Sequence, residues 1–244
     1  MPHPDKAHDA PSPQSEKRDL GKYIQGNRFV KKREFRNKPK YIWKFWPRLR
    51  TSKAAREKAC YDKMAGLGVP CPSHVKVREW RNWLGMLNAS EISMDYLPNT
   101  VDLRYIALDP AYACFREDPH WRKQVLEQLA HWVRVMHEHH FYPLNLHFRN
   151  ILVDPELQDK VELYFIDCMR GDFQTGARER EFRIKDLAYL YKDARTFCTL
   201  REQVRFAHLL FDSRKLVPEQ RLLLREVATL VKSKWGNRSS TLAD

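Results

Sequence analysis

The stretch YPLNLHFRNILVDPELQDKVELYFIDCMRG, residues 142–171, decides the fold of this chain. Its two short apolar runs, ILV at 151–153 and LYFI at 163–166, are bounded by polar residues, which is typical of buried strands. Asn150 precedes the first run and Asp167 follows the second, so an amide and a carboxylate lie at strand ends. These two polar residues at the ends of buried strands are the first candidates for a functional site.

The part of the chain before residue 100 is rich in strand signals. Aromatic and β-branched runs at 27–35 and 41–46 predict a hairpin, and alternating runs at 74–80 and 83–97 predict two further strands. Helix formers at 51–68 begin with a Thr or Ser cap and end at glycine. The predicted order is strand, strand, helix, strand, strand.

The later part of the chain is predominantly helical. In the segment 118–140, apolar residues recur at spacings of three and four, namely Leu126, Leu129, Val133 and Met136. Further helical patterns occur at 181–197, 201–211 and 218–235. We therefore predict an α+β fold with a disordered tail at 1–20, a small antiparallel β-rich lobe with one helix at 21–97, and a larger helical lobe at 98–244.

The formal net charge of +13 indicates an anionic partner. Basic and aromatic residues alternate at 28–50, which suits nucleic acid, anionic lipid or a phosphorylated sugar, or a basic solvated face with no dedicated partner. The aromatic residues alternate as in a strand core, so we do not expect nucleic acid. No run of about 18 apolar residues occurs. We expect a cytoplasmic protein, peripheral at the inner membrane.

Cysteine and histidine residues give little sign of a bridge or a metal site. The five cysteines include no C-x-x-C pair, so we expect neither a disulfide framework nor a zinc site, and we expect Cys168 to be a buried, inert thiol. His137 and His140 lack a third ligand at a suitable spacing. We expect them at a solvated helix end.

Several stretches resemble the kinases of the lipopolysaccharide inner core, the Kdo and heptose kinase family, a branch of the protein-kinase-like fold. They occur in order between residues 28 and 210: YIWKFW, AREKACYDKMAGLGVPCP, MDYLPNTVDL, NLHFRNILV, YFIDCMRGDF and FRIKDLAYLY. The resemblance implies a two-lobed protein-kinase-like fold with ATP and Mg²⁺ as cofactors.

The resemblance also implies roles for residues of the first lobe. Lys44 would contact the nucleotide phosphates, and Glu57, thirteen residues later, would anchor Lys44. The segment from Met94 through Tyr96 to Leu97 would form the hinge that binds adenine.

In the second lobe the resemblance implies that Asn150 and Asp167 bind Mg²⁺ and that Asp186 supports the catalytic loop. The chain departs from the family at Asn145, where the family has an aspartate that accepts the proton of the attacking hydroxyl. An amide can hydrogen-bond that hydroxyl but cannot accept its proton. His147 is the other candidate for this proton, although its position favours packing within the loop.

By this resemblance we expect an ATP-dependent phosphotransferase that phosphorylates a sugar hydroxyl, on Kdo or heptose, of the anionic, lipid-linked inner core of lipopolysaccharide. The alternative is a pseudokinase that binds nucleotide or acts as a scaffold, and Asn145 is its main support.

Overall fold

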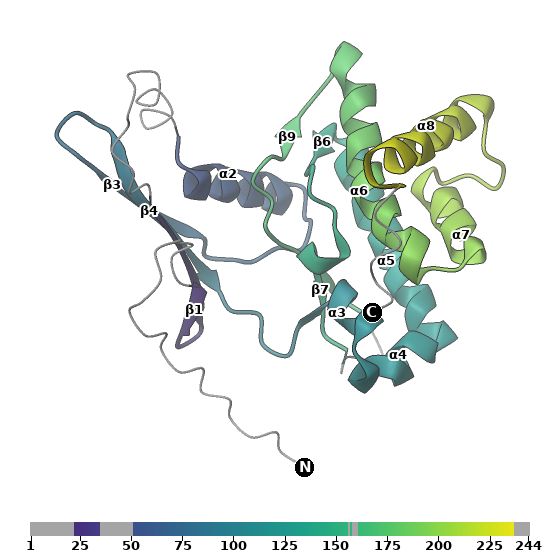
Figure 1. Ribbon diagram of the computed structural model, residues 1–244, viewed down its shortest axis with the longest axis horizontal. Helices are drawn as coiled ribbons and strands as arrows, with labels where there is room; N and C mark the ends of the chain where they lie inside the picture. The colour runs from purple at the N-terminus through teal and green to yellow at the C-terminus, as the bar shows by residue number, and fades with distance from the viewer. Residues whose placement is uncertain (1–21, 35–50, 156, 158–160, 237–244) are drawn as a thin grey trace.

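The structure, a computed structural model, describes residues 22–34, 51–155, 157 and 161–236. A four-stranded antiparallel sheet with helix α2 forms one side of the fold, and a group of helices forms the other (Figure 1). The predicted α+β class is confirmed. The predicted tail at 1–20 lies outside the described residues.

The sheet has the strand order β1-β2-β4-β3. Its members are β1 (Lys22–Gln25), β2 (Arg28–Glu34), β3 (Lys76–Arg81) and β4 (Leu87–Asp95). In β4, buried residues alternate with partly exposed ones, because one face of the sheet packs against α2.

Only the first strand of the hairpin predicted between 27–35 and 41–46 lies within the described residues, as β2. It pairs with β1, a strand that the sequence did not predict, through a turn at Gly26, whose φ of +57° lies in the left-handed region that glycine tolerates. Its other edge pairs with β4 along its whole length, so both edges of β2 are occupied between Arg28 and Lys31. Residues 41–46, including Lys44, lie outside the described residues.

Helix α2 (Lys53–Gly66) begins where the sequence predicts. The side chain of Ser52 caps it by accepting a 2.9 Å hydrogen bond from the main-chain N–H of Ala55. Its buried residues recur every three or four positions and form one face: Ala54, Glu57, Cys60, Tyr61 and Met64. Glu57 is the one acidic residue on this buried face, and its carboxylate needs a partner of opposite charge.

The helical lobe contains α3 (Leu103–Leu108), α4 (Ala113–Glu117), α5 (Pro119–Glu138), α6 (Glu179–Phe197), α7 (Leu200–Leu210) and α8 (Pro218–Trp235). Helix α5 packs against α7, and α6 packs against α8. Leu129, Val133 and Met136 of the predicted stripe are buried in the core. In the described part of the chain, no helix is both long and apolar enough to cross a membrane.

Short strands connect the two sides and position the polar residues. They are β5 (Val101–Asp102), β6 (Phe141–Tyr142), β7 (Ile151–Val153), β8 (Leu163–Phe165) and β9 (Asp172–Phe173). β7 and β8 are antiparallel, so Asn150, just before β7, lies beside Ile166 and Asp167, just after β8. The N–H of Ile166 donates to the carbonyl of Asn150 at 2.9 Å. The two strands predicted around Asn150 and Asp167 are confirmed.

Candidate active site

Three charged side chains from three distant segments meet between the sheet and the helical lobe. Nζ of Lys31, on β2, lies 2.8 Å from Oδ1 of Asp167 and 3.8 Å from Oε2 of Glu57 on α2. The Glu57 side chain is almost fully buried and that of Lys31 is mostly buried. A buried carboxylate is costly without a counter-charge, and Lys31 supplies it.

Lys31 thus contacts Glu57, the residue that the resemblance pairs with Lys44. Lys44 itself lies outside the described residues. The strand that runs between β1 and β4 is β2, and Lys31 lies near its middle, opposite Ile92. From the sequence, Lys31 is one of several basic residues in FVKKREF and carries no distinguishing mark. Only the sheet order singles it out.

Tyr61 connects Glu57 to the Asp167 segment. Its hydroxyl lies 3.4 Å from Oε1 of Glu57 and accepts a 2.9 Å hydrogen bond from the main-chain N–H of Asp167. Burial, and then the negative charge of Glu57, raise the pKa of Tyr61 well above its usual value. The phenol therefore stays neutral and keeps its proton for Glu57.

Asp167 has a left-handed backbone, with φ of +57°, which is uncommon for a residue other than glycine. Its main-chain carbonyl accepts a 2.7 Å hydrogen bond from Nδ2 of Asn145, and Nδ2 of Asn150 donates to the carbonyl of Asn145 at 2.9 Å. Such backbone positions persist where surrounding contacts hold them, often at functional sites. Asn145, Asn150 and Asp167 form one connected group.

Asp186 on α6 lies beneath the loop that carries Asn145. It is fully buried, with Oδ1 accepting a 2.8 Å hydrogen bond from the main-chain N–H of Leu144 and Oδ2 lying 2.8 Å from Nε2 of His137. Burial raises the pKa of Asp186, against the opposing effect of His137. Through its hydrogen bond to Leu144, Asp186 can hold the loop of Asn145 in place.

The expectation of a solvated helix end at His137 is wrong. His137 is buried at the end of α5, because its ring packs against Tyr142 and pairs with Asp186. His140 is exposed, with Nδ1 3.2 Å from Oε1 of Glu179. The spacing of residues in the sequence could not predict the burial of His137, since its partner Asp186 comes from α6.

His147 turns toward α6. Its Nδ1 lies 3.6 Å from Oδ2 of Asp193, and its ring packs against Tyr189. Burial alone would raise the pKa of Asp193, but hydrogen bonds from His147 and from the N–H of Phe148 outweigh it and lower that pKa. His147 thus has the packed position that its loop setting favours, and no described contact joins it to Asp167.

The predicted hinge connects β4 to the helical lobe. Met94 is buried in the core, and the ring of Tyr96 is exposed. The main-chain N–H of Tyr96 donates to the carbonyl of Asn27 at 2.8 Å. Because this N–H already donates within the protein, recognition of adenine by this segment would depend on other main-chain groups of the hinge.

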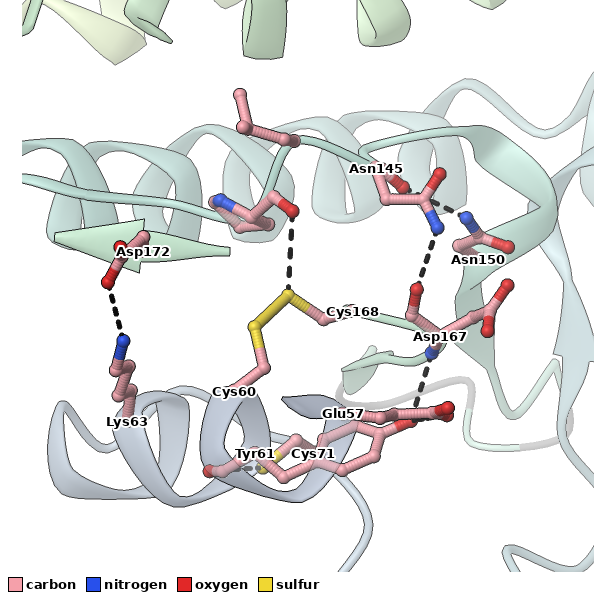
Figure 2. Close-up of a disulfide and its surroundings, with 12 residues drawn as sticks. Glu57, Cys60, Tyr61, Lys63, Cys71, Asn145, Asn150, Asp167, Cys168 and Asp172 are labelled. Atoms are coloured by element: carbon pink, nitrogen blue, oxygen red, sulfur yellow. Dashed lines mark hydrogen bonds and ion pairs between the residues drawn. A yellow bond between two sulfur atoms is a disulfide. The ribbon is translucent and has the colours of Figure 1, made fainter. Parts of the chain in front are cut away.

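Helix α2 is attached to the segment after β8 at three successive points (Figure 2). Besides the Tyr61 contact, Cys60 and Cys168 form a disulfide with their Cα atoms 5.9 Å apart, and Nζ of Lys63 lies 2.7 Å from Oδ1 of Asp172. Our expectation that Cys168 is a free thiol is therefore wrong. Residues separated by 108 positions meet only through the tertiary fold.

The polar group fits a nucleotide bound with Mg²⁺. Lys31 offers an ammonium for phosphate, Asp167 a carboxylate, and Asn150 an amide oxygen, which are the group types that such a site uses. The described residues contain no cluster of three or more His, Cys, Asp or Glu side chains suited to a metal. Mg²⁺ in phosphate sites often takes only one or two protein carboxylates.

A separate cavity of about 490 Å³ lies in the helical lobe. Its walls are mainly apolar and include Leu126, Leu190 and Val204, with Arg122 and Glu202 among its few charged residues. None of the residues of the Lys31–Asp167 site lines it.

Known proteins resemble this chain in sequence and in structure. The model of the lipopolysaccharide kinase (Kdo/WaaP) family matches residues 27–208, well over half of the 244 residues. A solved structure described as WaaP in complex with acyl carrier protein is similar with a TM-score of 0.62 and 24% identity, covering 84% of this chain and 79% of that chain. No curated protein matches. At this identity the structural likeness shows the fold, which is kinase-like.

Proposed function

This chain belongs to the lipopolysaccharide kinase (Kdo/WaaP) family, and we propose that it transfers the γ-phosphate of ATP to a sugar hydroxyl of the lipopolysaccharide inner core, on Kdo or heptose. The observation that carries the proposal is the meeting of Lys31, Glu57 and Asp167. Phosphoryl transfer depends mainly on positioning and on charge stabilisation, and this group supplies both.

In the proposed mechanism Lys31 binds phosphate oxygens, and Glu57 keeps its ammonium directed into the site. Asp167 and Asn150 would hold Mg²⁺, which would supply positive charge against the charge that develops on the transferred phosphate. Asp186 keeps the loop of Asn145 in place through Leu144. Each of these residues acts by position, and none forms a covalent intermediate.

The proton of the attacking hydroxyl is the step that Asn145 handles poorly. Its amide can orient the hydroxyl but cannot take the proton. A positioned general base contributes about 10²–10⁴-fold to a rate. We therefore propose a slow kinase, and the alternative is a pseudokinase that binds nucleotide without transferring phosphate.

Nucleotide binding measured by calorimetry with and without Mg²⁺ tests the site. We expect Mg²⁺ to strengthen binding to the wild type and to have no such effect on Asp167→Asn. Asp172→Asn is the matched control, because Asp172 lies on the same segment but pairs with Lys63 at the surface. A wild type that binds no nucleotide under either condition would exclude the kinase proposal.

A transfer assay with labelled ATP and purified core oligosaccharide then separates the two alternatives. Label on the sugar that depends on Asp167 supports the kinase. Binding of nucleotide without any label on the sugar supports the pseudokinase.

We further propose that the acceptor is lipid-linked and that the protein acts in the cytoplasm, at the inner-membrane surface. The net charge of +13 supports an anionic acceptor. An acyl carrier protein is a second candidate partner, because the similar WaaP structure contains one and the helical-lobe cavity is apolar. Native gel shifts with acylated and unacylated carrier protein would test it, since only the acylated form should gain from an apolar cavity.

A further inference from the structure

The turn between β3 and β4 carries the most exposed large apolar side chain of the described residues. Trp83 is 90% exposed, Leu84 beside it is 52% exposed, and Trp80 on β3 is 44% exposed. The hairpin extends past the end of α2, away from the helical lobe (Figure 1). Three large apolar side chains are thus gathered at a projecting tip, which marks an interaction site more strongly than one isolated residue would.

The turn has a defined backbone, so the exposure of Trp83 is built into the fold. Oδ1 of Asn82 accepts hydrogen bonds from the N–H groups of Leu84 and Met86, at 3.0 and 2.9 Å. The N–H of Gly85 donates to the carbonyl of Asn82 at 2.9 Å, and Gly85 has a φ of +73°. Arg81 adds a 2.9 Å hydrogen bond from Nη1 to the carbonyl of Gly85. The backbone is held while the indole projects into solvent.

The flanking charges are mainly positive. The hairpin from Lys76 to Leu87 contains three basic residues and one acidic residue. The acidic one, Glu79, pairs with Arg81 at 2.8 Å. Lys76 and Arg78 lie exposed on the same face of β3 as Trp80, and Glu91 of β4 lies opposite Arg78. A positive excess remains beside the apolar tip.

We propose that the β3–β4 tip, through Trp83 and Leu84, docks onto the surface of a bilayer that contains anionic phospholipid. Tryptophan prefers the headgroup level of a membrane, where its ring is apolar and its N–H stays hydrated. Basic side chains near an anionic surface each add about 1 kcal/mol of attraction. The anionic bilayer surface matches both the apolar tip and its basic flanks. An apolar pocket of a partner protein would match the apolar tip but not the basic flanks.

This inference deepens the proposed function, because a lipid-linked acceptor lies at a membrane, and it names the surface that makes the contact. The membrane contact does not itself require nucleotide or phosphate transfer. The two ideas can therefore fail separately.

Vesicle flotation of the full chain tests the proposal, with vesicles of phosphatidylcholine alone and of phosphatidylcholine mixed with phosphatidylglycerol. We expect the wild type to bind the mixed vesicles and to bind phosphatidylcholine alone more weakly. The double variant Trp83→Ser/Leu84→Ser should bind mixed vesicles at least about tenfold more weakly, since each exposed side chain loses its burial in lipid. The variant should fold normally, because both side chains are exposed.

Leu200→Ser is the matched control, since Leu200 is 75% exposed on α7, in the other lobe, and its loss should leave flotation unchanged. A repeat at high salt screens the general basic charge, so the difference between wild type and the double variant should remain there. Equal binding of the double variant and the wild type would overturn the proposal. So would a wild type that binds no mixed vesicles, which would favour a protein partner for Trp83.

Asp167→Asn separates this proposal from the kinase proposal. It should retain vesicle binding, while the double variant should retain Mg²⁺-dependent nucleotide binding. If the wild type binds vesicles through the tip but binds no nucleotide, the kinase proposal fails and the docking surface stands.

Discussion

Nδ2 of Asn145 donates a 2.7 Å hydrogen bond to the main-chain carbonyl oxygen of Asp167. An aspartate in its place would lack this donor and would set a charged oxygen against the carbonyl. Asn145, where the resemblance implies an aspartate, therefore has a structural role: it connects the loop before β7 to the segment after β8.

Asn145→Asp should consequently have two opposite effects. Transfer to the sugar should rise, by up to about 10²–10⁴-fold, because a carboxylate can accept the proton. Stability should fall by about 0.5–1.5 kcal/mol, because the hydrogen bond to Asp167 is lost. Initial rates and urea denaturation measure the two quantities.

Asn145→Ala serves as the control, since it removes the same hydrogen bond without adding a carboxylate. It should be destabilised to a similar degree and gain no activity. If Asn145→Asp transfers phosphate no better than Asn145→Ala, proton acceptance at this position does not limit the reaction.

Lys31→Met should abolish most of the nucleotide-dependent activity. The loss expected for a preorganised phosphate contact is about 10²–10³-fold in transfer rate. Lys58→Met is the matched control, because Lys58 lies exposed on α2 and pairs with Asp62 at 2.6 Å. Steady-state rates with labelled ATP would provide the measurement.

Lys44→Met tests the assignment drawn from the sequence resemblance. If Lys31 holds the phosphates, this change should leave the rate within a few-fold of wild type. The reverse pattern, with a severe loss in Lys44→Met and a mild one in Lys31→Met, would return the role to Lys44.

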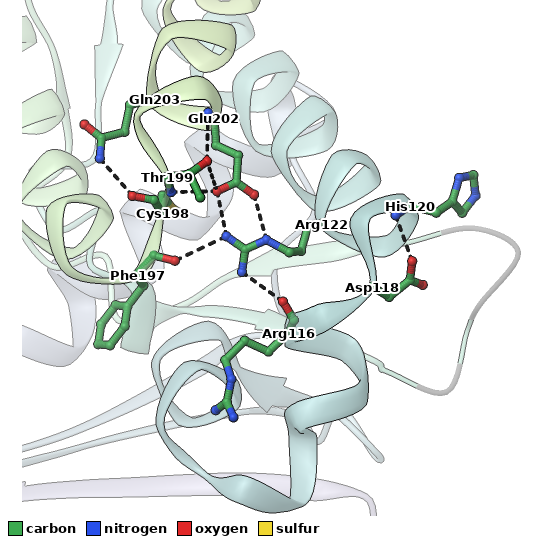
Figure 3. A network of polar contacts seen from close by, with 9 residues as sticks. All are labelled: Arg116, Asp118, His120, Arg122, Phe197, Cys198, Thr199, Glu202 and Gln203. Carbon is green, nitrogen blue, oxygen red and sulfur yellow. Dashed lines mark hydrogen bonds and ion pairs between the residues drawn. The ribbon is translucent and has the colours of Figure 1, made fainter.

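The ion pair between Arg122 and Glu202 joins α5 to α7 and should make stability depend on acid (Figure 3). Two hydrogen bonds of 2.6 Å connect them. Burial tends to raise the pKa of Glu202, but hydrogen bonds from Arg122 and Thr199 outweigh it and lower that pKa to about 2. Because the folded value is depressed, the stabilisation is complete above the unfolded value near 4.5 and disappears as pH falls toward about 2.

Glu202→Gln should therefore lower the free energy of unfolding by about 1–2 kcal/mol at neutral pH, a figure reduced for the partial exposure of the pair. The difference from wild type should shrink as pH falls from about 4.5 toward about 2. Glu127→Gln is the control, since Glu127 joins the same two helices through a more exposed pair with Arg205. A pH-independent difference would show that the ion pair is not its cause.

The Cys60–Cys168 disulfide predicts a redox-dependent stability. Peptide mapping without reductant should recover the linked pair from protein kept under oxidising conditions. A dithiol reductant, or Cys168→Ser, should then lower the free energy of unfolding by about 2–4 kcal/mol. Cys114→Ser should have no effect, because Cys114 is a free, exposed thiol. Complete alkylation of all cysteines in unreduced, denatured protein would show that no bridge forms.

The sequence alone predicted β2, β3 and β4, helix α2, the four long helices α5 to α8, and the two strands that frame Asn150 and Asp167. These features depend on local patterns, namely alternation in strands, spacings of three and four in helices, and capping residues such as Ser52. The antiparallel pairing of β7 and β8 then follows from their proximity, and it brings Asn150 and Asp167 to one end of the strands.

The tertiary structure alone decided which residues meet across the chain. Lys31 reaches Glu57 and Asp167 because β2 lies between β1 and β4. His137 finds Asp186 on another helix, and Cys60 finds Cys168 across 108 positions. Such contacts depend on strand order and on how helices pack, and the energy that selects them comes from burial of the whole core, which no local pattern of residues records.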